Sequence, residues 1–255
     1  MPTKTTNETV DILEVKRGRI EFYVLGQSPL VCNSMSGKTR RELLFPTGRK
    51  SAAQRAASLK HEPLREFSDS IYRFTNDDAS TLIGMPATAF KKACMGAALD
   101  IPGAKKAQIG RLMYVESDMV PIFGTPEIML SVVRSADINK TPDVRTRAVL
   151  PTWCSKFTIG FTEPMLKAPV ISRLLAAAGM MQGIGDWRVE KGSGDYGRFE
   201  VVSGDHPQVK LLMETGDREA QIEAMENPQP YDSESEQLLR YHAEEMVRRG
   251  FKAAA

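Results

Sequence analysis

The residues best suited to chemistry lie in one glycine-rich stretch, residues 183–201. Its glycines, cationic groups and aromatic ring include Gly183, Gly185, Trp187, Arg188 and Arg198. Glycine lets backbone amides approach a ligand without an intervening Cβ, while guanidinium groups bind phosphate and aromatic rings stack on bases. The stretch therefore predicts a site for an anionic polymer with stackable units. The alternative is a turn that only connects a helix to a strand, with Trp187 as its anchor.

Further basic residues are concentrated ahead of this stretch. Residues 37–65 carry eight Lys or Arg against two Glu, whereas residues 214–255 carry ten acids against five bases. A basic segment can meet phosphate, and an acidic tail can cover a neighbouring basic surface or keep an assembly soluble. The candidate nucleic-acid-binding residues outside the glycine-rich stretch are Lys38, Arg40, Arg41, Lys91, Lys92, Arg145 and Arg147.

Metal and hydrolase chemistry find little support in the sequence. The three histidines lie far apart, with no acid or cysteine at ligand spacing. Cys32, Cys94 and Cys154 are odd in number and scattered, which suits neither a disulfide framework nor a zinc cluster and predicts small buried side chains. No nucleotide-binding phosphate loop and no hydrolase triad can be assembled. We therefore expect neither a cofactor nor a metal.

The composition is that of an ordinary globular protein. The chain has 255 residues, of which 42% are hydrophobic, and a formal net charge of +2. No window approaches the roughly 18 uninterrupted apolar residues of a membrane span. The N-terminus lacks the apolar centre of a signal peptide. We expect a cytoplasmic protein that does not contact a membrane.

The elements that must position the candidate residues follow an order typical of an α+β fold. Alternation over residues 10–25 predicts a first strand, and Pro86 marks a helix that runs to about Leu99. A second helix is expected at 162–178, directly ahead of the glycine-rich stretch, and a last strand at 198–202. This order fits the split β-α-β arrangement of ferredoxin-like or RNA-recognition folds.

We expect this palm to span residues 1–213, interrupted by a long basic insertion at 33–66 and a hairpin with a basic turn at 119–147. Residues 214–255 should form an acidic helical extension, an interaction element outside the core. Two shorter elements are also expected, a helix at 51–59 and a strand at 67–74.

Two motifs carry a resemblance to a known family. Residues 84–92 read GMPATAFKK, and residues 183–199 end in Gly197-Arg198-Phe199. The first resembles the I-P-G-S-S-L-K-G helix start of the RAMP superfamily, the repeat-associated proteins of CRISPR effector complexes. The second resembles the C-terminal glycine-rich loop of that superfamily.

The resemblance covers roughly residues 15–203 and is best to the backbone subunit called the seventh Cas family. It implies a ferredoxin-like palm, a hairpin thumb, and copies of the protein stacked helically along a guide RNA beside other effector-complex subunits. The thumb would be either the hairpin at 119–147 or the insertion at 33–66.

One departure from the family bears on catalysis. Backbone subunits that cut target RNA are similar in carrying an aspartate in the loop after the first strand, whereas residues 30–35 here contain no acid. The amide of Asn33 cannot hold a divalent metal or act as a base as a carboxylate can. We therefore expect an RNA-binding subunit that grips the sugar-phosphate backbone without cleaving it and without reading base sequence.

Two other functions remain open. A phage or mobile-element protein could use the same fold to bind single-stranded DNA or to serve a structural role, because fold does not dictate function. An RNA endonuclease that uses His61 is the third possibility.

Overall fold

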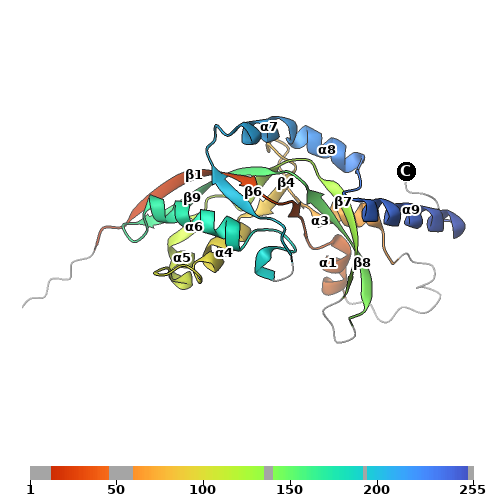
Figure 1. Cartoon of the computed structure of the whole chain (residues 1–255), viewed down its shortest axis with the longest axis horizontal. Coiled ribbons are helices and arrows are strands. Elements are labelled where there is room, and N and C mark those ends of the chain that lie inside the picture. Colours follow the sequence, from red (N-terminus) through yellow and green to blue (C-terminus); the bar gives the residue numbers. More distant parts are fainter. Residues whose placement is uncertain (1–12, 46–59, 135–139, 192–193, 252–255) are drawn as a thin grey trace, which may run out of the picture.

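The structure is a computed structural model that describes residues 13–45, 60–134, 140–191 and 194–251 (Figure 1). The helix expected at 51–59 lies outside the described residues. The strands are β1 (Lys16–Gly26), β2 (Leu30–Val31), β3 (Tyr72–Arg73), β4 (Ile83–Pro86), β5 (Met113–Val115), β6 (Met119–Phe123), β7 (Glu127–Arg134), β8 (Pro142–Leu150), β9 (Cys154–Glu163) and β10 (Phe199–Val202). The helices are α1 (Gly37–Leu44), α3 (Pro63–Ser70), α4 (Ala87–Ala97), α5 (Lys106–Leu112), α6 (Ala168–Met181), the 3-10 turn Val189–Lys191, α7 (Pro207–Thr215), α8 (Arg218–Glu226) and α9 (Ser233–Arg248).

The large sheet confirms the ferredoxin-like α+β prediction. Its order is β10-β1-β9-β6-β4-β3, with β5 also paired to β9, and the paired strands run antiparallel. Along the chain, β1 is followed by α4 and then β5 and β6, and β9 is followed by α6 and then β10. These are two β-α-β units in which the fourth strand lies beside the first and the third beside the second.

Helices α4 and α6 cover one face of this sheet (Figure 1). The aromatic side chains Phe22, Phe90, Phe157 and Phe199 are buried there, with the rings of Phe90 and Phe157 4.4 Å apart between centroids. Burial of apolar area of this kind is the main favourable term in folding. It holds the start of α4 and the end of α6 on the same side of the sheet.

The C-terminal extension packs on the body, which corrects the expectation that it lies outside the core. Gln221 of α8 is fully buried. Its amide donates to the carbonyl oxygens of Ile122 and Gly124 at 2.7 and 2.9 Å, and its oxygen accepts from the backbone N–H groups of Leu82 and Ile83. These strand-end groups would otherwise be buried without partners, so α8 supplies hydrogen bonds that the sheet needs.

A second, three-stranded sheet has the order β2-β8-β7 and carries the hairpin. The hairpin consists of β7 and β8, and Met119–Phe123, expected as part of it, forms β6 in the large sheet. Both β6 and β7 are apolar, so their spacing does not reveal which sheet each joins. Helix α9 packs along β7, where Ser235 donates to the carbonyl of Leu130.

Two element boundaries also differ from expectation. Residues 67–74 are not one strand, because α3 occupies Pro63–Ser70 and buries Phe67 and Ser70, three residues apart on one helical face. The helix expected at 162–178 begins only at Ala168, since β9 continues to Glu163. The prediction that Cys32, Cys94 and Cys154 are buried is confirmed.

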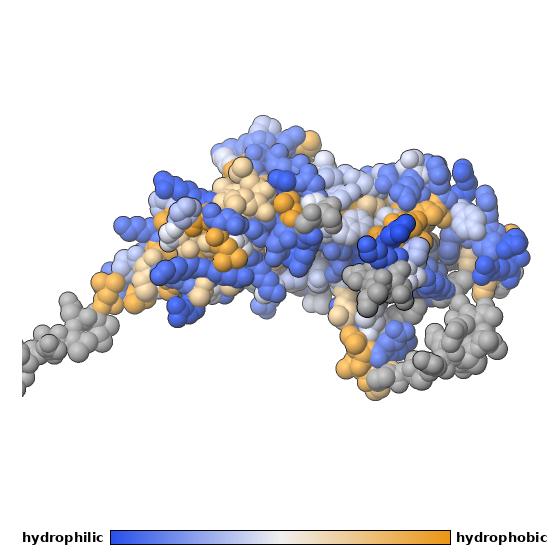
Figure 2. Space-filling view, turned by 60° about the horizontal axis from the view of Figure 1, so that its bottom comes forward, coloured by the Kyte–Doolittle hydropathy of each residue, from blue (hydrophilic) through white to orange (hydrophobic). Residues whose placement is uncertain are grey.

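Among the described residues, no helix combines the length and apolar composition that crossing a bilayer requires. Figure 2 shows a largely hydrophilic face on which apolar residues gather at the end of α1. The exposed residues there are Leu43, Leu44 and Phe45.

Candidate nucleic-acid interface

The two sequence motifs meet at one hollow of about 280 Å³, here called the loop hollow. One wall is the start of α4, with Thr88, Ala89 and Lys92, and the other is the glycine-rich loop, with Gly183, Gly185 and Arg188. About ninety residues of sequence separate the two walls. The sheet brings them together because α4 and α6 pack side by side, and α6 leads directly into the loop.

The start of α4 can attract an anion. Its N-cap residue, Pro86, provides no side-chain hydrogen bond to the first turn, and Thr88 and Ala89 of that turn line the hollow. The N–H of Ala87 donates to the carbonyl of Asp118 at 2.9 Å, but a helix N-terminus without a side-chain cap still leaves other first-turn N–H groups for a ligand and carries a partial positive charge. The exposed side chain of Lys92 adds a full charge one turn later.

The loop wall requires glycine at two positions. Gly183 and Gly185 have φ angles of +66° and +84°, in the left-handed region that other residues rarely adopt. A Cβ on Gly185 would also lie 2.6 Å from the carbonyl oxygen of Val31. The loop is tied to the second sheet, since Asp186 N–H donates to Val31 at 2.9 Å and Gly197 N–H donates to Pro29 at 2.8 Å.

Arg188 lies in the loop hollow but is held from within the loop. Its Nη1 donates to the carbonyl of Gly185 at 2.9 Å, and its Nη2 pairs with Glu190 at 2.7 Å. Part of its hydrogen-bonding capacity is therefore used to fix the loop conformation. The free donors of this hollow lie mainly on the α4 wall.

Arg147 of β8 joins the hairpin sheet to the glycine-rich loop. Its Nε lies 3.5 Å from Asp186 Oδ2, which also accepts a hydrogen bond from Asn33 Nδ2 at 2.8 Å. Burial lowers the pKa of Arg147, and the charge of Asp186 opposes that shift. Arg147 thus positions the loop, and Asn33 is a donor to a carboxylate.

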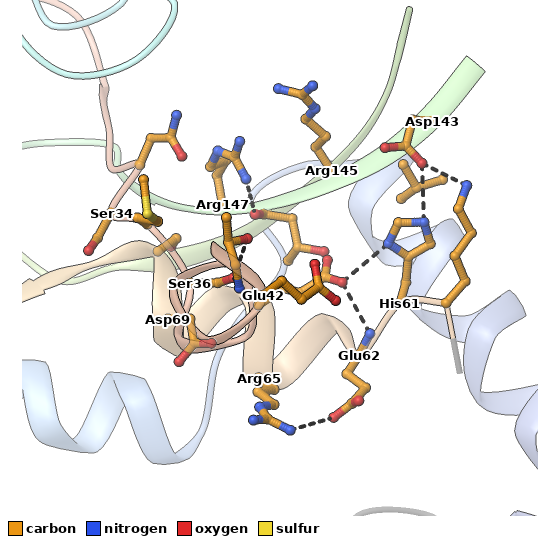
Figure 3. A pocket seen from close by; sticks show the side chains of 18 of the residues that line it. Ser34, Ser36, Glu42, His61, Glu62, Arg65, Asp69, Asp143, Arg145 and Arg147 are labelled. Atoms are coloured by element: carbon orange, nitrogen blue, oxygen red, sulfur yellow. Dashed lines mark hydrogen bonds and ion pairs between the residues drawn. The ribbon is translucent and has the colours of Figure 1, made fainter. Parts of the chain in front are cut away.

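A larger hollow of about 700 Å³ lies beside β8 and is here called the hairpin hollow (Figure 3). Its walls come from α1, α3 and β8, and it is lined by five carboxylates and four cationic side chains besides His61. Asp143 accepts from Lys60 at 2.8 Å and lies 3.3 Å from His61 Nε2, while Glu66 lies 3.2 Å from His61 Nδ1. Most of these charges are therefore paired with one another.

A third hollow of about 360 Å³ contains Arg40 and is here called the Arg40 hollow. Arg73, Tyr72 and Asp69 also line it. Arg40 Nη2 lies 3.4 Å from Ser34 Oγ, and Arg73 Nη2 donates to Ser68 Oγ at 2.6 Å. Both guanidinium groups thus bond to neutral oxygens.

The structure separates the predicted site residues into groups. Lys92, Gly183, Gly185 and Arg188 line the loop hollow, Arg145 and Arg147 line the hairpin hollow, and Arg40 lines the third. The predicted residues outside the walls of these hollows are Arg41, Lys91, Trp187 and Arg198. Lys38 lies in α1, and its side chain is outside the described part of the chain.

Trp187 and Arg198 are engaged elsewhere. The ring of Trp187 packs against the buried cluster of Val31, Met129 and Val149, beside Tyr196. Arg198 donates to the carbonyl of Met180 at 2.9 Å and pairs with Asp195. These contacts match the reading in which Trp187 anchors the loop.

Sequence reasoning missed Tyr72 and Arg73 as candidate site residues. It considered Asn33 only as a position that lacks a carboxylate. Tyr72 borders all three hollows, and Asn33 borders two. The signal available was the adjacent aromatic and cationic pair Tyr72 and Arg73, but the strand expected at 67–74 concealed it. Within the described ranges, no cluster of three or more His, Cys, Asp or Glu side chains could hold a metal ion.

No protein-family model matches the chain, and no curated protein matches it. Among solved structures, the chain is similar to a chain of the type III-B Cmr-beta bound to cognate target RNA, with a TM-score of 0.37, 12% identity, and coverage of 74% of this chain and 60% of that one. It is also similar to Cmr6 from Pyrococcus furiosus, with a TM-score of 0.38, 10% identity, and coverage of 73% of this chain and 98% of that one. Similarities at these values do not support assigning a function to this chain.

Proposed function

We propose that the chain is a non-catalytic subunit that binds single-stranded RNA through its backbone and assembles in multiple copies along a guide RNA in a CRISPR effector complex. The observation that carries the proposal is the loop hollow, where an uncapped helix N-terminus, Lys92 and a glycine-rich backbone face one another. Phosphate is the ligand that such a combination favours. The parts of the proposal that concern a guide RNA and assembly in multiple copies rest on the resemblance of both walls to RAMP motifs.

The proposal is tested first by affinity. Fluorescence anisotropy with a labelled, unstructured RNA and with a DNA of the same sequence should give tighter binding to RNA, with an affinity that falls as salt rises. Lys92→Glu should weaken binding on the order of tenfold and lower the salt slope by about one. The control is Lys210→Glu on α7, which lies on the opposite face of the large sheet.

Three results would overturn the proposal in different parts. Salt-independent binding, or no binding, would remove the nucleic-acid site. Equal loss in Lys92→Glu and Lys210→Glu would remove the loop hollow as its location. Tighter binding to the DNA would favour a single-stranded DNA protein of a mobile element.

Assembly and lack of cleavage need separate measurements. The mass of the RNA complex in solution should rise in steps as the RNA is lengthened, since each protomer occupies a fixed length of strand. Labelled RNA incubated with the protein and Mg²⁺ should stay intact, because Asn33 offers an amide where a carboxylate would be needed. Cleavage that is lost in His61→Ala would instead support an endonuclease.

A further inference from the structure

Tyr72 is the one residue that borders all three hollows among the described residues. It is the first residue of the two-residue strand β3, which pairs with β4 through Tyr72 and Gly84. Tyr72 lines both the loop hollow and the Arg40 hollow, so the two hollows adjoin at this residue. A polymer that passes from one of these hollows to the other here therefore passes Tyr72.

The side chain of Tyr72 is held in place by its hydroxyl. The phenolic O–H donates to the carbonyl of Asn33 at 3.1 Å, and the residue is only partly buried. Burial raises the pKa of Tyr72, with smaller contributions from Cys32 and Asp186 that Arg40 opposes. A neutral, oriented ring with access to solvent is a suitable platform for base stacking.

The cations beyond Tyr72 differ from those in the hairpin hollow. Arg40 and Arg73 contact hydroxyl and carbonyl oxygens, and neither has a carboxylate partner within the described residues. In the hairpin hollow, Lys60 pairs with Asp143 and Arg147 pairs with Asp186, while Arg145, which has no carboxylate partner among the described residues, lies in a hollow lined by five carboxylates. Phosphates would therefore meet unpaired guanidinium groups in the Arg40 hollow and mostly neutralised charge in the hairpin hollow.

We infer that a single-stranded polynucleotide runs from the loop hollow across Tyr72 into the Arg40 hollow, with one base stacked on the Tyr72 ring and phosphates bound by Arg40 and Arg73. This inference rests on the proposed function and names the path of the strand. It assigns Tyr72 and Arg73 to binding, which neither motif of the sequence includes. The stacked base is held by its π face, so any base is accepted.

A double-mutant cycle between protein and ligand tests the stacking. Binding of an unstructured RNA and of the same RNA with its bases removed is measured for wild type, Tyr72→Phe and Tyr72→Leu. Tyr72→Leu should weaken binding to the intact RNA by about 5- to 150-fold and leave binding to the abasic RNA nearly unchanged. Tyr72→Phe keeps the ring but loses the hydrogen bond to Asn33, so it should lose less affinity for the intact RNA than Tyr72→Leu. Tyr241→Leu, on the exposed part of α9, is the matched control.

The salt dependence tests the path. Arg40→Gln and Arg73→Gln should each lower the salt slope by about one, whereas Arg145→Gln in the hairpin hollow should leave it unchanged. Thermal unfolding of each variant separates lost contacts from lost folding. This matters most for Arg73, whose guanidinium also bonds to Ser68.

The outcomes separate this inference from the proposed function. If wild type binds no RNA, both fail. If wild type binds RNA with the expected Lys92 dependence but Tyr72→Leu loses affinity equally for intact and abasic RNA, stacking is excluded and the proposed function stands. If Arg145→Gln lowers the salt slope while Arg40→Gln and Arg73→Gln do not, the strand enters the hairpin hollow and the path is wrong.

Discussion

The loop hollow and the hairpin hollow differ in what their walls are made of. The smaller loop hollow, about 280 Å³, is walled by glycine backbone and a helix N-terminus, and its two carboxylates, Asp186 and Glu190, pair with Arg147 and Arg188. The hairpin hollow, about 700 Å³, is walled by charged side chains that mostly pair with each other. Size and number of charges would single out the hairpin hollow, yet the donors left without partners favour the loop hollow. For an anionic ligand, unpaired donors matter more than volume.

The largest effect is expected from a variant that deforms the loop wall. Gly185→Ala should lower the free energy of unfolding by about 2 kcal/mol or more and abolish RNA binding, because the left-handed φ and the contact with the Val31 carbonyl both penalise a Cβ. Urea unfolding followed by circular dichroism measures the first effect and anisotropy the second. Gly37→Ala is the control, since nothing lies within 4 Å of its added Cβ. Equal stability of the two variants would mean that the loop has no strict backbone requirement.

The next largest effect is expected where Arg147 of the hairpin sheet contacts Asp186 of the glycine-rich loop. Asp186→Ala should lower the free energy of unfolding by about 2 kcal/mol, because Arg147, with a side chain only 16% exposed, loses its counter-ion and Asn33 loses its acceptor. Glu190→Ala, which breaks the more exposed pair with Arg188, should cost under about 1 kcal/mol. Chemical denaturation of both variants gives the two values. A larger loss in Glu190→Ala would contradict the assigned roles.

A smaller effect should appear in the hairpin hollow when the pH is lowered. The hydrogen bond from Lys60 lowers the pKa of Asp143, so the folded carboxylate ionises below its unfolded value. Its contribution to stability is complete above the unfolded pKa of about 4 and is lost as the pH falls through the lower folded pKa. Asp143→Asn should cost under about 1 kcal/mol near neutral pH, and the difference from wild type should vanish in acid. A difference that persists in acid would mean that Asp143 acts through packing.

The smallest signal should come from the three buried thiols. Burial raises the pKa of Cys32, Cys94 and Cys154 to about 12, so almost no thiolate exists at about pH 8. Native protein should react negligibly with a thiol reagent, and denatured protein should react at all three positions. Fast labelling of Cys32 in the native state would mean that the wall beside Asn33 opens.

The part of the fold that sequence predicts well is the part with strong periodicity. The first strand, the helix after Pro86 and the final strand place α4 and the glycine-rich loop correctly, and with them Lys92 and Gly185. Short elements were not recoverable in the same way. A two-residue strand such as Tyr72–Arg73 has no period of its own, and tertiary pairing with β4 decides its conformation.

The sequence also did not predict which charged side chains pair with one another. Arg188 and Arg198 look alike as cations, but Glu190 holds one in the loop hollow and Asp195 with the Met180 carbonyl holds the other away from it. Trp187 had two possible roles at the sequence level, and packing against Val31 places it in the buried cluster of the second sheet. Such outcomes depend on partners far apart in sequence, which local composition does not reveal.

Gln221 ties the order of synthesis to the order of folding. Its single amide satisfies the ends of β4 and β6, which precede it by about 140 and 100 residues. During translation, those strand ends lack their hydrogen-bond partner until residue 221 has left the ribosome. The sheet therefore acquires its last hydrogen bonds late, through contacts of high sequence separation. A chain that stops before α8 should therefore leave the N–H groups of Leu82 and Ile83 and the carbonyls of Ile122 and Gly124 without these partners, and incompletely folded chains of this kind are prone to aggregate.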